Sequence, residues 1–74
     1  MTPNLLRTIG EALYGTSWQG GLAADLEIDA RNLRRWVAGG REMPEEYRER
    51  LRVLVSERQA LLEHLAREIS GSEG

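Results

Sequence analysis

Residues 19–40, QGGLAADLEIDARNLRRWVAGG, decide the fold. They contain two short segments with apolar residues at helical spacing, separated by a break at residues 27–29. Asp29 is a strong N-cap for the second segment, because its carboxylate can accept a hydrogen bond from a free N–H group of the first turn. Gly39 is suited to end that segment. The stretch therefore predicts two short helices joined by a tight turn.

The second segment has two chemically different sides. At about 100° per residue, its apolar and polar side chains separate cleanly around the helix axis. The apolar side consists of Ala30, Leu33, Trp36 and Val37. The polar side consists of Arg31, Asn32, Arg34 and Arg35. We expect the first side to pack in a core and the second to offer hydrogen-bond donors to an anionic partner.

Three helix boundaries are predicted before this segment. Pro3 suits the first turn of a helix, and Gly15 suits the end of that helix. Thr16 and Gln19 have the spacing of a capping box, which makes Thr16 the predicted N-cap of the next helix. The glycine pair after Gln19 would weaken that helix, unless it allows close approach to another backbone.

A long helix is predicted after Pro44. Apolar residues recur in steps of three and four as far as about Ile69, and nothing breaks the pattern. A helix of this length exceeds what a small core can cover, so the part from about Ser56 should project and pair with another helix. The alternative is a break near Ser56, with the chain folding back onto one core. The sequence thus predicts an all-α fold of four or five helices with a long C-terminal helix.

These elements divide the chain into three parts. Residues 1–55 form the predicted core domain, residues 56–70 a helical extension for dimerisation, and residues 71–74 a disordered tail. Pairing of two extensions would make a homodimer, with an interface along the apolar stripe and the arginine within it. The expected interface residues are Leu54, Arg58, Leu61, Leu62, Leu65 and Ile69.

Composition excludes several classes of function. With 74 residues, the chain is at most one small domain. It has no cysteine and one histidine, so we expect no disulfide, no metal site and no cofactor. It contains no nucleophile–base arrangement and no phosphate loop, which argues against an enzyme. No apolar run is long enough to span a membrane, and a cytoplasmic protein is expected.

The charges are unevenly distributed. The net charge is −2, yet residues 30–41 contain four arginines and no acidic residue. From Glu42 onward, eight glutamates outnumber five arginines. A local basic surface can therefore attract phosphate although the whole chain is acidic.

Residues 19–39 resemble the helix-turn-helix of the Cro and lambda-repressor class of short phage and bacterial regulators. The pattern of that class is a glutamine, a Leu-Ala pair, a second leucine, a capping residue, an aliphatic residue, a bulky residue and a glycine. Here these positions hold Gln19, Leu22, Ala23, Leu26, Asp29, Leu33, Trp36 and Gly39. One position departs from the pattern: Glu27 replaces the usual glycine of the turn, where a left-handed backbone costs a non-glycine residue about 1 kcal/mol or more.

The resemblance implies binding to double-stranded DNA, with the second helix of the motif in the major groove. The residues expected to face base edges are Ala30, Arg31, Asn32 and Arg35. Those expected to contact the DNA backbone are Gln19, Gly20, Arg34 and Arg41. Arginine suits guanine, asparagine suits adenine, and an alanine methyl suits thymine.

The predicted function is a homodimeric repressor of transcription, which binds an inverted repeat with its reader helices about 34 Å apart. No small-molecule ligand is expected. The alternative is a protein-interaction adaptor, such as the antitoxin of a toxin–antitoxin pair, whose C-terminal helix covers a partner protein. Such a protein could bind DNA as well.

Overall fold

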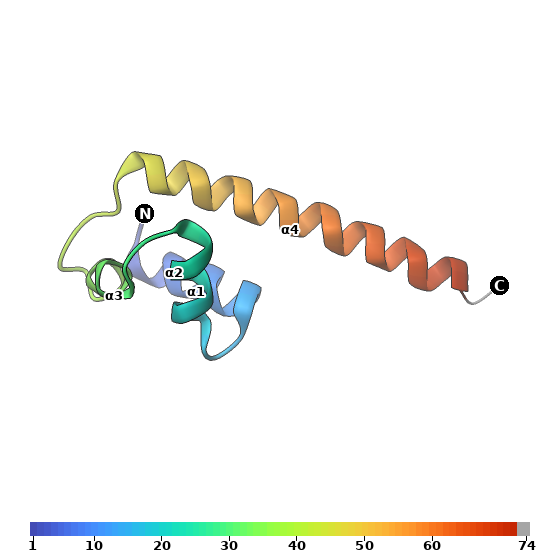
Figure 1. The fold of residues 1–74 in the computed structure, drawn as a ribbon, viewed down its shortest axis with the longest axis horizontal. Helices are drawn as coiled ribbons and strands as arrows, with labels where there is room; N and C mark the ends of the chain where they lie inside the picture. Colours follow the sequence, from blue (N-terminus) through green and yellow to red (C-terminus); the bar gives the residue numbers. More distant parts are fainter. Residues whose placement is uncertain (73–74) are drawn as a thin grey trace.

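The computed structural model describes residues 1–72, and all regular structure in this part of the chain is helical. The helices are α1 (Pro3–Tyr14), α2 (Trp18–Leu26), α3 (Ala30–Val37) and α4 (Glu45–Ser72). Figure 1 shows α1, α2 and α3 gathered beneath the first half of α4, while the second half of α4 extends beyond them. The predicted all-α fold with a long C-terminal helix is confirmed, with four helices.

The ends of α1 follow the local sequence signals. Thr2 is the N-cap, and its side-chain oxygen accepts a hydrogen bond from the backbone N–H of Leu5 at 3.1 Å. Pro3 stands in the first turn, where its missing N–H costs nothing. Gly15 ends the helix with a φ of 84°, a backbone conformation that glycine adopts readily. The predicted start and end of this helix are therefore confirmed.

The start of α2 differs from the prediction. The helix begins at Trp18, and Ser17 holds the N-cap position without a side-chain cap hydrogen bond. The capping box predicted at Thr16 and Gln19 was therefore wrong. Trp18 is only 4 % exposed, and burial of an indole outweighs the ~1 kcal/mol that a cap contributes. Packing of Trp18, rather than capping by Thr16, sets where α2 begins.

The turn between α2 and α3 takes a left-handed conformation in spite of its glutamate. Glu27 has a φ of 58° and a ψ of 44°. The N–H of Glu27 bonds to the carbonyl of Ala24 at 3.1 Å, and the N–H of Ile28 bonds to that of Ala23 at 3.0 Å. These two bonds form a Schellman motif, which satisfies the last carbonyls of α2. The carboxylate of Asp29 then accepts a bond from the N–H of Arg31 at 2.9 Å, as its predicted capping role requires.

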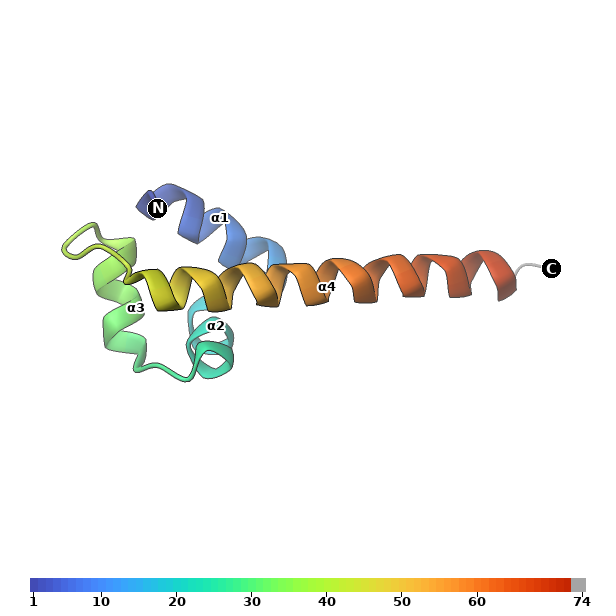
Figure 2. The same ribbon diagram turned by 90° about the horizontal axis from the view of Figure 1, so that it is seen from above.

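One apolar core joins the four helices. Figure 2, seen from above, shows α4 with α1 on one side and α2 on the other, while α3 crosses the line of α4 near its start. Leu33 and Trp36 are buried, as predicted, and the ring of Trp36 lies 5.4 Å from that of Tyr47 on α4. The buried core residues are Leu6, Trp18, Leu22, Ala23, Leu26, Leu33, Trp36, Met43 and Leu51.

Two glycines permit the closest contacts between α1 and α2. A Cβ at Gly10 would lie 2.1 Å from Cε3 of Trp18, and a Cβ at Gly21 would lie 2.7 Å from Cδ1 of Tyr14. Both distances are far below van der Waals contact, so only glycine fits at either position. Gly20 faces open space. The close approach expected for the glycine pair in α2 therefore involves Gly21 alone, and its neighbour is an aromatic ring.

Helix α4 is unbroken, and the alternative of a chain that folds back near Ser56 is not adopted. It begins directly after Pro44, whose carbonyl accepts bonds from the first turn. From Gln59 to Ser72 every residue is exposed. We call residues 59–72 the projection, and the rest of the described chain the head. The first two residues of the predicted tail, 71 and 72, belong to α4, while residues 73 and 74 lie outside the described part.

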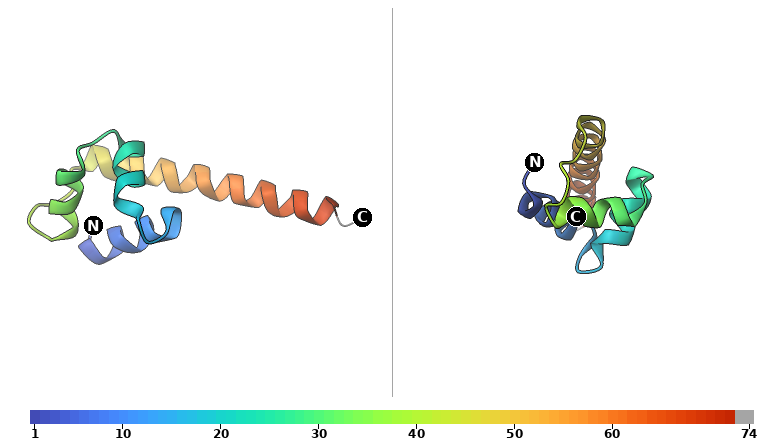
Figure 3. Two further views of the ribbon diagram at one scale, coloured as in Figure 1. Left: turned by 60° about the horizontal axis from the view of Figure 1, so that its bottom comes forward. Right: turned by 90° about the vertical axis from the view of Figure 1, so that its left-hand side faces the viewer.

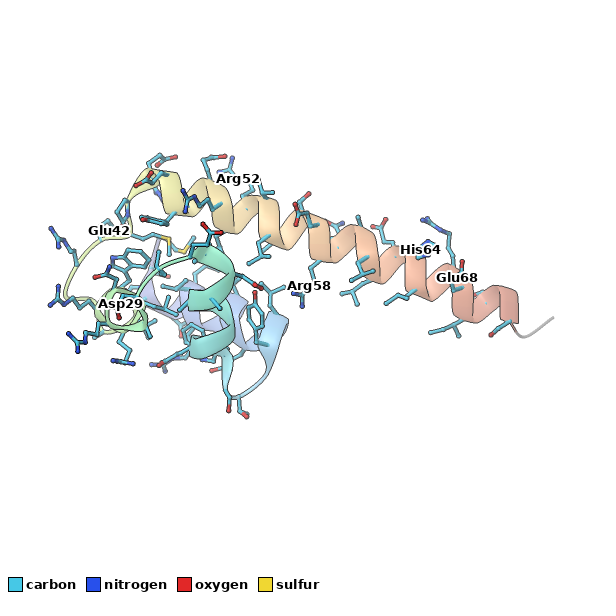
Figure 4. All side chains as sticks on the ribbon, viewed as in Figure 1. Asp29, Glu42, Arg52, Arg58, His64 and Glu68 are labelled. Atoms are coloured by element: carbon cyan, nitrogen blue, oxygen red, sulfur yellow. The ribbon has the colours of Figure 1, made fainter. Side chains whose placement is uncertain are left out.

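Two arginines of α4 tie it to the ends of the shorter helices. Arg50 donates a hydrogen bond to the carbonyl of Leu26, the last residue of α2, at 3.2 Å. Arg58 donates to the carbonyl of Leu13, at the end of α1, at 3.0 Å, and its guanidinium lies 5.4 Å from the centre of the Tyr14 ring. Figure 4 shows Arg58 reaching from α4 toward the head. A cation is favourable at both places, because free carbonyls make a helix C-terminus negative.

A candidate nucleic-acid interface

Helix α3 lies at the end of the molecule opposite the C-terminus. Figure 1 shows it below the start of α4, and in the right-hand view of Figure 3 it crosses the front of the molecule. Leu33 is 0 % and Trp36 is 6 % exposed, which fixes the rotation of the helix about its axis. The opposite side of α3 consequently faces away from the core of the head and from the projection.

The polar side chains predicted for this outer side are exposed. Arg31, Asn32 and Arg35 are exposed, and Ala30 is half-buried at the edge of the core. Of the residues predicted to contact the DNA backbone, Arg34 and Arg41 are also exposed. The helical wheel therefore placed these side chains correctly with respect to solvent.

The arginines around α3 have no acidic partner in the described part of the chain. The arginine salt bridges found among residues 1–72 join Arg48 to Glu45 and Arg52 to Glu49, both on α4. Figure 4 shows side chains with terminal nitrogens extending into open space around α3 and the loop that follows it. Within residues 1–72, therefore, no salt bridge neutralises the arginines of this surface. We call it the arginine face, formed by Arg31, Arg34, Arg35 and Arg41.

The nearest acidic residue in the loop is matched by a different cation. The carboxylate of Glu42 lies 2.9 Å from the N-terminal ammonium of Met1. This hydrogen bond, with the charge of the ammonium, holds the pKa of Glu42 below its ordinary value. The loop is held further by a bond from the N–H of Gly40 to the carbonyl of Arg35 at 3.0 Å, and by burial of Met43. Arg41 thus projects from an anchored loop.

The start of α2 is a second group of potential phosphate ligands. Gln19 is half-buried and Gly20 is exposed. Because Ser17 makes no side-chain cap bond, the first N–H groups of α2 are not used by a capping side chain. Residues 16–20 line a shallow hollow of about 410 Å³. In Figure 1, residues 16–20 and α3 both lie on the side of the head that is opposite α4. Free helix N-terminal N–H groups are suited to bind phosphate.

The residues predicted for a dimer interface fall into two groups. Leu54 packs against the core, and Arg58 bonds to the carbonyl of Leu13, so both have contacts within their own chain. The others lie on the projection, with apolar side chains that are 45–63 % exposed. They are Leu61, Leu62, Leu65 and Ile69.

The described part of the chain contains neither a metal-binding cluster nor a membrane-spanning helix. No three His, Cys, Asp or Glu side chains of residues 1–72 come together in a group that could hold a metal ion. His64 is exposed on α4 and lies 3.7 Å from Glu68 one turn further along the helix. Within the same residues, no helix is both long enough and apolar enough to cross a membrane.

Comparison with known proteins does not identify a family for this chain. No protein-family model matches the chain, and neither the curated proteins nor the solved structures include a significant match.

Proposed function

We propose that this protein is a sequence-specific DNA-binding regulator of transcription, with α3 as its reader helix. The observation that carries the proposal is the two-sided environment of α3. Leu33 and Trp36 anchor one side in the core, while the other side holds exposed arginines that form no salt bridge within residues 1–72. An α-helix with its side chains is about 10–12 Å across, and the major groove of B-DNA is about 12 Å wide. An exposed, cationic helix at one end of the molecule fits that groove.

The proposed roles follow from chemistry and position. Arg31 and Arg35 lie farthest from the core, and each can make two hydrogen bonds to guanine. Asn32 can make two to adenine in the same way. Ala30, at the edge of the face, offers a methyl group to thymine. These four residues would supply the sequence specificity.

The remaining residues would hold the protein on the DNA backbone. Arg34 and Arg41 flank the reader positions, and a guanidinium pairs well with a phosphate. Gln19 and Gly20 contribute the open N-terminus of α2, where N–H groups attract anions. Binding of this kind at a promoter would exclude RNA polymerase, so repression by a homodimer is the proposed mode of regulation.

Binding should be tested by fluorescence anisotropy with duplexes from the region upstream of the protein's own gene, in the presence of competitor DNA. Arg35→Ala should weaken specific binding by about 1–3 kcal/mol, roughly five- to 150-fold. The control is Arg52→Ala, which removes an exposed arginine from α4, away from the arginine face. Absence of competitor-resistant binding, or equal losses in both variants, would contradict the proposal.

A second function is favoured by the exposed leucines of the projection. In this alternative, the protein is an interaction adaptor such as an antitoxin, and α4 covers a partner encoded by a neighbouring gene. Size-exclusion chromatography with light scattering separates the two ideas. A stable homodimer of the pure protein favours the regulator, whereas a monomer that forms a stable complex with the neighbouring gene product favours the adaptor.

A further inference from the structure

The exposed apolar side of the projection continues the side of α4 that packs on the head. On a helical wheel with about 100° per residue, the exposed apolar residues of the projection lie within about 60° of the centre of the side that faces the head. The head-facing residues are Tyr47, Leu51, Leu54 and Arg58, and those that continue the same side are Leu61, Leu62, Leu65 and Ile69. One uninterrupted stripe thus runs along α4. The head covers its first half, and in the single chain nothing among residues 1–72 covers its second half (Figure 1).

A groove opens where the covered part of the stripe ends. It lies between the end of α1 and the middle of α4 and has a volume of about 450 Å³. Ala12 and Leu13 line it from the head, while Val55 and Leu62 line it from α4. The groove therefore joins the exposed stripe to the head, and a helix lying along the stripe would place its end in the groove.

The position of the head decides how two copies can pair. Figure 1 shows the head beneath α4, and helical spacing places the exposed stripe on that same side of α4. In a parallel pair, each copy would place its head in the space between the two helices, and the heads would collide. In an antiparallel pair, each projection enters the free space under the other projection, and the two heads lie at opposite ends.

Charge favours the same arrangement. The exposed part of the stripe is bounded by Arg58 at the head end and by Glu68 near its far end. Arg58 uses its Nη1 atom for the bond to the carbonyl of Leu13, which leaves further N–H donors on the guanidinium. In an antiparallel pair, Arg58 of each copy lies near Glu68 of the other copy, so two such pairs of opposite charge form. A parallel pair would instead bring like charges together.

We propose that the partner of the projection is a second copy of this chain, paired antiparallel along residues 55–72. In the register that this implies, Leu62 packs against Leu65 of the second copy. Ile69 of each copy then lies at the groove beside Leu13 of the other. Residues 55–72 form an overlap of about 25 Å. This inference concerns the free protein and does not depend on DNA binding.

Antiparallel pairing separates the two α3 helices widely. One chain is 52 Å long, so with an overlap of about 25 Å the pair would be about 80 Å long. Each α3 lies at one end of this rod, and its arginine face is directed away from the centre. The pair therefore presents two reader helices in opposite directions, rather than side by side. This geometry differs from the dimer expected from the sequence, whose reader helices bind adjacent half-sites of one inverted repeat about 34 Å apart.

The first test measures association without DNA, by light scattering and analytical ultracentrifugation over a wide concentration range. The wild-type chain should be a dimer. Leu65→Glu should weaken dimerisation by about 100-fold or more, because it puts a charge into an apolar contact. Ala12→Glu should also weaken it, since Ala12 lines the groove on the head. Ala60→Glu, on the opposite side of α4, should leave it unchanged.

These variants are designed to fold. Leu65 is 45 % exposed in the single chain, and Ala12 and Ala60 are exposed. Circular dichroism and thermal melting of each variant should show the helical head intact. A wild-type monomer at every concentration would overturn the proposal, as would an equal effect of Leu65→Glu and Ala60→Glu. A monomer that instead binds a neighbouring gene product through the stripe would assign the surface to a different protein.

The second test measures orientation. The chain contains no cysteine, so Glu46→Cys, at the exposed start of α4, introduces a single site for a spin label. Double electron–electron resonance should give about 50 Å between the two labels of an antiparallel pair. A parallel pair would give about 10–20 Å, set by the separation of neighbouring helices, and that result would overturn the proposed orientation. Loss of DNA binding would leave both results unaffected, so failure here is distinguishable from failure of the proposed function.

Discussion

The six-membered ring of Trp18 lies directly over Gly10, so that a Cβ at Gly10 would be 2.1 Å from the ring. Gly10→Ala should therefore destabilise the head by about 1–3 kcal/mol, the usual range for overpacking, although alanine favours helix by about 1 kcal/mol. Urea unfolding followed by tryptophan fluorescence measures the change. Gly20→Ala is the control, because Gly20 is helical and faces open space. It should stabilise the protein by about 0.5–1 kcal/mol. A stabilising Gly10→Ala would contradict the observed packing.

Glu27 bears the strain of the turn between α2 and α3. Glu27→Gly should raise the free energy of unfolding by about 0.5–1 kcal/mol, because glycine adopts a φ of 58° at little cost. Glu27→Val should lower it, since a β-branched residue is poorly suited to the left-handed region. Chemical denaturation of both variants is the measurement. The idea fails if glycine destabilises the protein at this position.

The phenol of Tyr14 should make stability depend on alkaline pH. Burial and a hydrogen bond from its hydroxyl to Asp25 raise the pKa of Tyr14 from 10.0 to about 12. Because the pKa is raised in the folded state, the phenol of Tyr14 makes its full contribution to the free energy of unfolding below pH 10. That contribution is lost as pH rises toward about 12. Tyr14→Phe should abolish this part of the pH dependence. Denaturation at several pH values in that range, with tyrosinate absorbance as a second readout, checks it; identical pH profiles would argue against the effect.

Arg41 should contribute affinity without sequence preference if the proposed function is correct. Arg41→Ala should weaken binding to specific and random duplexes by similar factors. It should also reduce the slope of log K against log salt by about 0.9, the value for one phosphate contact. Salt titrations on both duplexes provide the measurement. A loss confined to the specific duplex would instead make Arg41 a base reader.

The antiparallel pair should bridge two DNA segments. Its reader helices would lie about 70 Å apart, roughly two turns of B-DNA, and would be directed away from each other. A dimer should therefore retain a labelled duplex on beads that carry a second, unlabelled duplex. Leu65→Glu should lose retention while each head still binds DNA in solution. Cooperative binding to half-sites one turn apart would favour side-by-side heads and contradict this geometry.

The helices and the core could be predicted from sequence because their signals are local. Pro3, Gly15 and Asp29 define boundaries through their own backbone chemistry, and helical spacing alone identifies Leu33 and Trp36 as core. The start of α2 could not be predicted in this way. It depends on Trp18 packing over Gly10, a contact between two helices that no cap signal encodes.

The candidate site was predictable to a similar degree. A helical wheel places Arg31 and Arg35 on the outer side of α3, and the structure agrees. The lack of acidic partners depends on which residues approach in space, and spacing along the chain does not reveal it. The same holds for Arg50 and Arg58, whose bonds to Leu26 and Leu13 span 24 and 45 residues. For Arg58, sequence reasoning indicated only a place in the apolar stripe of α4.

Because both tryptophans are buried in the head, tryptophan fluorescence and far-UV circular dichroism report on different parts of this protein. The chain has two tryptophans, Trp18 and Trp36, and both lie in the core. Their fluorescence emission therefore reports on the unfolding of the head and does not respond to unfolding of the projection. Far-UV circular dichroism follows all the helices, and α4 supplies 28 of the helical residues. If ellipticity falls with heating or dilution before the emission changes, the projection has frayed while the head stays folded. The strength of self-association could then be separated from the stability of the domain in one unlabelled sample.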